Sequence, residues 1–70
     1  MKDPLNPIRN YLSFHFIQWE MRGRYLAIWD KCDWFLFDPR FGILQVGLTC
    51  FNFGKDWEAK EVIKALSENL

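Results

Sequence analysis

Hydrophobic positions near the start of the chain recur with a helical period. Between residues 6 and 23 the large side chains fall three and four residues apart, which places them on one face of a helix. The positions on that face are Ile8, Tyr11, Leu12, His15, Phe16 and Trp19. Asn6 suits an N-cap, Pro7 a first helical position and Gly23 a residue just after a helix. The pattern therefore predicts one helix over residues 6–22, although so many aromatic side chains are typical of a strand.

Three strand-like segments follow Gly23. Residues 24–31 and the apolar run Trp34–Phe37 are separated by a polar turn. Asp38-Pro39, with a glycine shortly after, predicts a hairpin loop, and residues 43–51 predict the third strand. Gly47 within that strand indicates either a bulge or a break into two shorter pieces.

The end of the chain predicts a second helix. Its apolar stripe is Ala59, Val62, Ile63, Leu66 and Leu70, and Asp56 suits its N-cap. The order of elements is then α-β-β-β-α. We expect a small single α+β domain over residues 1–70, with a three-stranded antiparallel sheet and N- and C-terminal helices.

The predicted sheet is apolar on both faces. One face carries Leu26, Ile28, Leu44, Val46, Leu48 and Cys50, and the other carries Tyr25, Ala27, Trp29, Ile43, Gln45, Thr49 and Phe51. The middle strand is apolar in either register, so either Trp34 or Phe35 points outward. Three strands span about 15 Å and each helix is about 10–12 Å across, so two helices on one side fill that side. We expect this arrangement, which leaves the second face bare; one helix on each face is the alternative.

A bare aromatic sheet face predicts a protein-binding surface, because tyrosine, tryptophan and arginine dominate interface hot spots. The residues that we assign to this surface are Arg24, Tyr25, Trp29, Phe35, Phe37, Arg40, Ile43 and Phe51. The competing interpretation is that Trp29, Phe35 and Phe37 are core residues of the fold itself.

Composition and charge narrow the class of protein. Half of the 70 residues are hydrophobic, which predicts a folded chain. Nine lysines and arginines balance nine aspartates and glutamates, which argues against a general nucleic-acid or membrane-surface binder and favours a homodimer or a permanent partner. Residues 1–4 carry no secretion signal and no apolar run is long enough to span a bilayer, so we expect a soluble cytoplasmic protein.

Candidate chemistry is sparse, and we expect no catalytic residue, metal or cofactor. His15, the one histidine, lies on the apolar face of the predicted helix, and Ser13 faces away from it. Cys32 and Cys50 have no zinc spacing and are expected to be free thiols. The aspartates around the middle strand match no calcium loop; they are Asp30, Asp33 and Asp38.

The expected order of elements and the stretch Glu58-Ala59-Lys60 resemble the double-stranded RNA-binding domain family. That resemblance implies an RNA partner contacted through cations at the start of the last helix. Where the family has two lysines, this chain has Asp56 and Trp57, which leaves Lys60 and Lys55 to meet phosphates.

The combined pattern predicts a non-catalytic binding protein that occludes a surface of a larger protein or nucleoprotein. Phages and mobile elements encode many very small chains that block host defence enzymes, so an anti-defence inhibitor such as an anti-CRISPR is the favoured example. The alternatives are a degenerate RNA-binding domain and a small homo-oligomeric structural subunit.

Overall fold

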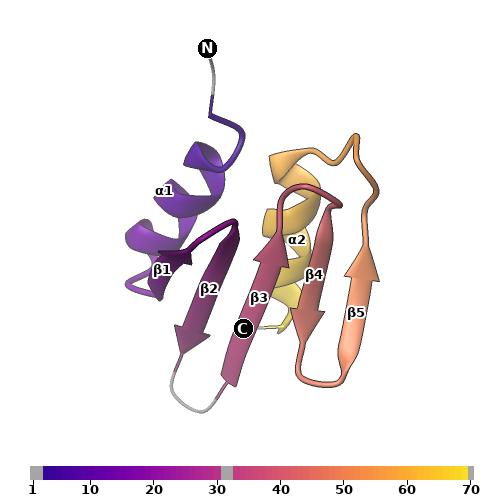
Figure 1. The fold of residues 1–70 in the computed structure, drawn as a ribbon. Helices are drawn as coiled ribbons and strands as arrows, with labels where there is room; N and C mark the ends of the chain where they lie inside the picture. Colours follow the sequence, from indigo (N-terminus) through magenta and orange to yellow (C-terminus); the bar gives the residue numbers. More distant parts are fainter. Residues whose placement is uncertain (1–2, 31–32, 70) are drawn as a thin grey trace.

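The structure, a computed structural model, describes residues 3–30 and 33–69. Its elements are α1 (Asn6–Phe14), β1 (Gln18–Arg22), β2 (Tyr25–Asp30), β3 (Asp33–Asp38), β4 (Ile43–Val46), β5 (Thr49–Asn52) and α2 (Ala59–Asn69). All neighbouring strands are antiparallel, and they lie in the sheet in chain order (Figure 1). The α+β class and the two terminal helices agree with the expectation. The three-stranded sheet and the α-β-β-β-α order are wrong, because the structure has five strands.

The first extra strand comes from the second half of the predicted N-terminal helix. Helix α1 stops at Phe14, and Phe16 adopts a left-handed backbone with φ of 60°. The N–H of Ile17 donates to the carbonyl of Leu12 at 2.8 Å, and the N–H of Phe16 donates to that of Ser13 at 3.1 Å. This pair of bonds is a Schellman motif, which closes a helix and turns the chain away from its axis. The residues after it are therefore free to form β1.

The second extra strand comes from Gly47, where the predicted third strand breaks into β4 and β5. Gly47 and Leu48 form a two-residue turn, as Gly23 and Arg24 do between β1 and β2. Each glycine has a positive φ at the first turn position, 59° for Gly47 and 63° for Gly23, as a type II′ hairpin requires. The reversal at Gly47 also moves Phe51 to the opposite face from the one expected.

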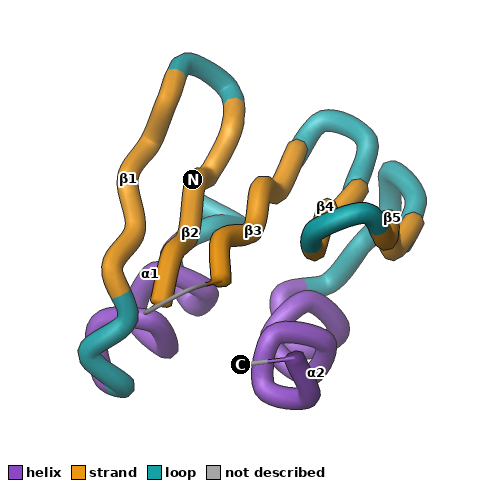
Figure 2. The backbone as a smooth tube through the Cα atoms, turned by 90° about the horizontal axis from the view of Figure 1, so that it is seen from below, coloured by secondary structure: helices purple, strands orange, loops and turns teal. Residues whose placement is uncertain are grey.

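Both helices lie against one face of the sheet, with α1 under β1 and β2 and α2 under the later strands (Figure 2). Five strands at about 4.8 Å span about 24 Å, which two helices of about 10–12 Å each match. The helix layer thus covers the width of the sheet on one side. Neither described helix lies over the other side, which we call the open face.

The core fills the space between the helices and the sheet. Its fully or almost fully buried members are Leu5, Ile8, Leu12, Leu26, Ile28, Phe35, Phe37, Leu44, Val62, Ala65 and Leu66. These residues come from both helices, from Leu5 just before α1, and from β2, β3 and β4. Burying them all in one cluster is what ties the helices to the sheet.

Helix α2 begins at a different cap from the one predicted. The carboxylate of Glu61 accepts a hydrogen bond from the N–H of Glu58 at 3.0 Å, and the carbonyl of Glu58 accepts the first helical bonds. This is one half of a capping box centred on Glu58. Asp56 lies before the cap, and the predicted stripe residue Leu70 lies outside the described residues.

Candidate protein-binding face

Strand alternation places every second residue of the sheet on the open face. Its members are Gln18, Glu20, Arg22, Tyr25, Ala27, Trp29, Trp34, Leu36, Asp38, Ile43, Gln45, Cys50 and Asn52. The apolar members lie on the three central strands, whereas β1 and β5 at the two edges contribute mainly polar side chains. An apolar centre with a polar rim is the composition of a protein interface.

Trp34 and Tyr25 are the most exposed rings of the open face. Trp34 is 56% exposed and Tyr25 is 38% exposed. Trp34 lies directly opposite Trp29 in the register of β2 and β3, so two indole side chains stand next to each other at one end of the face.

A hollow of about 240 Å³ lies beside Trp29 and Trp34. Ala27 is buried between larger neighbours and lines the hollow together with Trp29, Trp34 and Arg22. A small residue flanked by indole rings provides a depression that a partner side chain can enter.

The indole of Trp29 is fixed in place from the neighbouring strand. Its Nε1–H donates to the side-chain oxygen of Gln18, which is its cross-strand partner on β1. A ring held by a hydrogen bond loses less rotamer entropy when a partner binds than a free ring would lose.

Three arginines lie toward the opposite end of the open face. Arg22 ends β1, Arg24 lies in the β1–β2 turn, and Arg40 lies in the β3–β4 loop at the same end of the sheet (Figure 1). Two of them pair with acids: Arg22 Nε lies 2.8 Å from Glu20, and Arg40 Nε lies 3.4 Å from Asp38. The Arg22–Glu20 pair is exposed on both sides and contributes little to stability, whereas Arg40 is partly exposed and its partner Asp38 is largely buried.

The structure separates the predicted site residues into two groups. Tyr25, Trp29 and Ile43 lie on the open face, and Arg24 and Arg40 lie in turns at its rim. The expectation that the other three would be exposed anchors is wrong for Phe35 and Phe37, which are fully buried under the helices. Phe51 is half-buried and packs against the same core.

The pairing register of β2 and β3 explains why Phe35 and Phe37 lie on the helix-facing side of the sheet and not on the open face. Phe35 pairs with Ile28 and Phe37 pairs with Leu26, so both phenylalanines share the helix-facing side of the sheet. Trp34 and Leu36 consequently point to the open face. Sequence reasoning left this register open because all four residues are apolar, and a shift by one residue exchanges the two faces.

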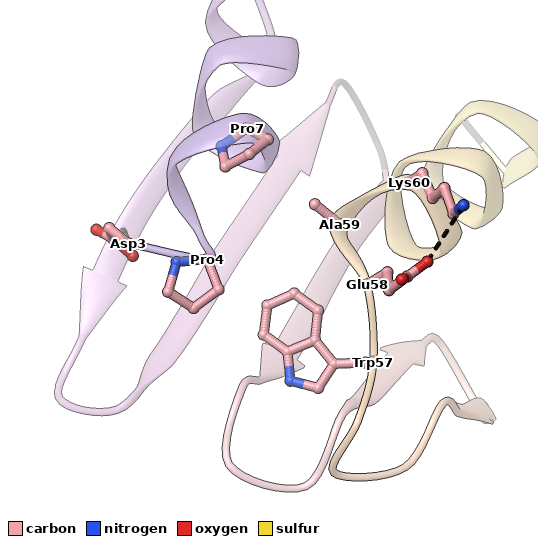
Figure 3. Close-up of a pocket in the computed structure, with 7 residues that line it drawn as sticks. All are labelled: Asp3, Pro4, Pro7, Trp57, Glu58, Ala59 and Lys60. Atoms are coloured by element: carbon pink, nitrogen blue, oxygen red, sulfur yellow. Dashed lines mark ion pairs between the residues drawn. The ribbon is translucent and has the colours of Figure 1, made fainter. Parts of the chain in front are cut away.

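A larger hollow lies elsewhere, between the starts of the two helices (Figure 3). It measures about 570 Å³ and is lined by Asp3, Pro4, Pro7, Trp57, Glu58, Ala59 and Lys60. Its polar groups are already engaged. Lys60 lies 3.3 Å from Glu58, Asp3 pairs with Arg9, and the Trp57 indole donates to the carbonyl of Pro39 at 2.7 Å. The hollow therefore offers few groups to a ligand.

Within the described residues, the side chains with potential chemistry lie at the end of α1 and on the edge strand β5. His15 is exposed at the end of α1 between the rings of Tyr11 and Phe14, which corrects its expected place on a buried helix face. The hydroxyl of Ser13 accepts a hydrogen bond from the Trp19 indole at 3.0 Å. Within residues 3–30 and 33–69, no three His, Cys, Asp or Glu side chains gather closely enough to hold a metal ion. Cys50 is an exposed free thiol, and Cys32 lies outside the described residues.

Comparison of this chain with protein-family models, curated proteins and solved structures finds no match. The resemblance to double-stranded RNA-binding domains also loses its basis in topology, because the sheet has five strands. In the part of the chain that the structure describes, neither helix has the length and apolarity needed to cross a membrane.

Proposed function

We propose that this protein is a non-catalytic binding module whose open face docks on a larger protein and blocks the surface beneath it. One observation carries the proposal: an apolar stripe that includes Tyr25, Trp29 and Trp34 runs along the central strands on the side away from both helices. A protein that inhibits by occlusion needs no active site. A phage-encoded inhibitor of a host defence enzyme or nucleoprotein is a role that this surface fits.

The charges at the edges of the open face favour a protein partner over a nucleic acid. The open face carries acidic as well as basic side chains at its edges, Glu20 and Asp38 beside Arg22 and Arg40, and the net charge of the chain is zero. Binding to nucleic acid rests mainly on uncompensated cations that neutralise phosphates. Protein interfaces instead combine a ring-rich centre with rim charges of both signs. We also propose the cytoplasm as its compartment, which the exposed free thiol of Cys50 fits.

The test compares an open-face variant with a matched control. Trp34→Ser removes the most exposed ring of the open face, and Leu48→Ser removes a fully exposed side chain in the β4–β5 turn. The tagged wild type captures its partner from the cells that encode it, and calorimetry with the purified partner then measures the affinity. We expect Trp34→Ser to weaken binding at least about tenfold and Leu48→Ser to leave it unchanged.

Three outcomes would overturn the proposal. Equal affinity of both variants would show that the open face is not the contact surface. Recovery of a nucleic acid with strongly salt-dependent affinity would indicate the RNA-binding alternative. A dimer in sedimentation equilibrium that Trp34→Ser dissociates would make a second copy the occupant of the open face.

A further inference from the structure

Phe16 has a conformation and an exposure that the fold does not require. Its left-handed backbone is unfavourable for a residue with a side chain, and glycine would end the helix without that cost. Its ring is 94% exposed, so burial within the chain does not offset the strain. Strained residues persist mainly where they serve a function. The ring of Phe16 is therefore a candidate for contact with another molecule.

A hollow of about 290 Å³ lies beside this ring. It is lined by Phe16, Gln18, Trp29 and Asp30, and we call it the notch. Small-molecule sites measure about 300–1,000 Å³, so the notch is sized for a single side chain. Trp29 also lines the hollow on the open face, so the notch lies next to the proposed binding surface.

The charge in the notch comes from Asp30. The ion pairs found in the described residues use the carboxylates of Asp3, Glu20, Asp38 and Glu58. Asp30 therefore has no charged partner in that part of the chain, although it is half-buried. The amide oxygen of Gln18 is already occupied by the Trp29 indole. Two aromatic rings and one carboxylate remain to recognise a ligand.

A cation is the ligand that satisfies all three groups together. Aromatic faces attract ammonium and guanidinium ions, and the attraction grows as the cation loses water. The carboxylate adds a charge-assisted hydrogen bond. An anionic side chain would be repelled by Asp30, and an apolar one would cover the carboxylate without pairing it.

We propose that the notch binds a cationic side chain, arginine or lysine, which the partner protein presents at the edge of the open face. This inference deepens the proposed function and depends on it for the source of the side chain. The binding chemistry belongs to the notch alone, so it can be measured without the partner.

The probe is N-acetyl-arginine methylamide, and its neutral isostere N-acetyl-citrulline methylamide is the control ligand. Two-dimensional NMR of the ¹⁵N-labelled full chain follows the indole N–H of Trp29 during titration, with sodium chloride as the ionic-strength blank. We expect saturable shifts centred on Trp29 and Phe16 with the arginine probe, and about tenfold weaker binding of the citrulline probe.

Variants assign the effect to the notch. Asp30→Asn keeps the shape and removes the charge, and Phe16→Gly removes one ring; each should weaken the arginine probe about fivefold to tenfold. Phe14→Ala, which removes an exposed ring outside the notch, should bind as the wild type does. The dispersion of each spectrum reports whether the variant is folded.

The proposal is overturned if citrulline binds as well as arginine, if Asp30→Asn binds unchanged, or if the shifts do not centre on the notch. Each of these results would leave the open face as a docking surface intact. Conversely, failure of Trp34→Ser to affect the partner would not alter binding of the probe to the notch. The two proposals therefore fail independently.

Discussion

At the scale of single residues, the left-handed backbone of Phe16 lowers the stability of the fold. We expect Phe16→Gly to raise the free energy of unfolding by about 0.5–1 kcal/mol. Relief of the left-handed strain is worth roughly 1–2 kcal/mol, and the greater freedom of glycine in the unfolded chain returns part of it. Urea unfolding at neutral pH measures the change.

Phe14 provides the matched control for this substitution. Its ring is also exposed, but its backbone belongs to α1, so Phe14→Gly should lower the free energy of unfolding by about 0.5–1 kcal/mol. The two glycines are thus expected to act in opposite directions. If both destabilise the protein, left-handed strain at Phe16 is not the reason for the cost.

The pairing of Asp3 with Arg9 predicts that the stability of the protein depends on pH. Its hydrogen bond to Arg9, and then its bond to the N–H of Leu5 at 3.0 Å, hold the pKa of the Asp3 carboxyl below its usual range. A carboxyl with a depressed pKa stabilises the folded state above its unfolded pKa, and this stabilisation is lost as the pH falls through the folded value. Asp3→Asn should therefore lower the free energy of unfolding at neutral pH.

The same difference should shrink as the pH falls below about 4, and it should vanish once the pH lies below the folded-state pKa of Asp3, where both states of the wild type carry a protonated Asp3. Urea unfolding of the two proteins across this range follows the difference. Asparagine retains an oxygen that can accept the N–H of Leu5, so the comparison reports mainly the charge. A difference that does not shrink at all as the pH falls below about 4 would contradict the role of Arg9.

At the scale of elements, the sequence predicts the helix α1 but not the residue at which it ends. Periodicity and Pro7 identify the helix correctly as far as Phe14. Trp19 then falls on the helical face by spacing alone, although it belongs to β1. The usual stop signal is a glycine in the left-handed position, and here that position holds Phe16. The sequence pattern alone therefore predicts that the helix continues to the next glycine, Gly23.

The end of the sheet shows a second limit of sequence reasoning. Gly47 is consistent with either a bulge or a break, and periodicity cannot decide between them because the residues on both sides are apolar. The turn at Gly47-Leu48 pairs Val46 with Thr49 and so reverses the alternation after it. Cys50 moves to the open face and Phe51 to the helix-facing side as a result.

At the scale of the whole molecule, the bare second face could be predicted because it depends on composition more than on register. An apolar run such as Trp34–Phe37 leaves side chains on both faces wherever it is placed. Which rings are exposed depends on pairing across strands, and the chain carries no local signal for that. The expected face was therefore found, with Trp34 and Leu36 in place of Phe35 and Phe37.

At the same scale, the segment between β5 and α2 brings the chain back from the edge of the sheet and places α2 under it. The N–H of Phe53 donates to the carbonyl of Gly42 at 2.7 Å, which joins this return to the β3–β4 loop. The ring of Trp57 then meets Phe37 edge-on, with centroids 4.9 Å apart. Gly42 lies at the closest approach, with φ of 65° and no space for a side chain.

We expect Gly42→Ala to destabilise the whole domain by roughly 3 kcal/mol or more. A Cβ at this position would overlap the backbone carbonyl of Gly54 and lie 2.9 Å from Cδ1 of Trp57, and the carbonyl cannot swing aside as a flexible side chain would. Gly23→Ala is the control, because it has a similar φ in open space and should cost only about 1 kcal/mol. Thermal and urea unfolding of both variants compare the two costs. Equal losses would mean that backbone conformation alone requires Gly42, and that its contact with the segment before α2 does not hold the two layers together.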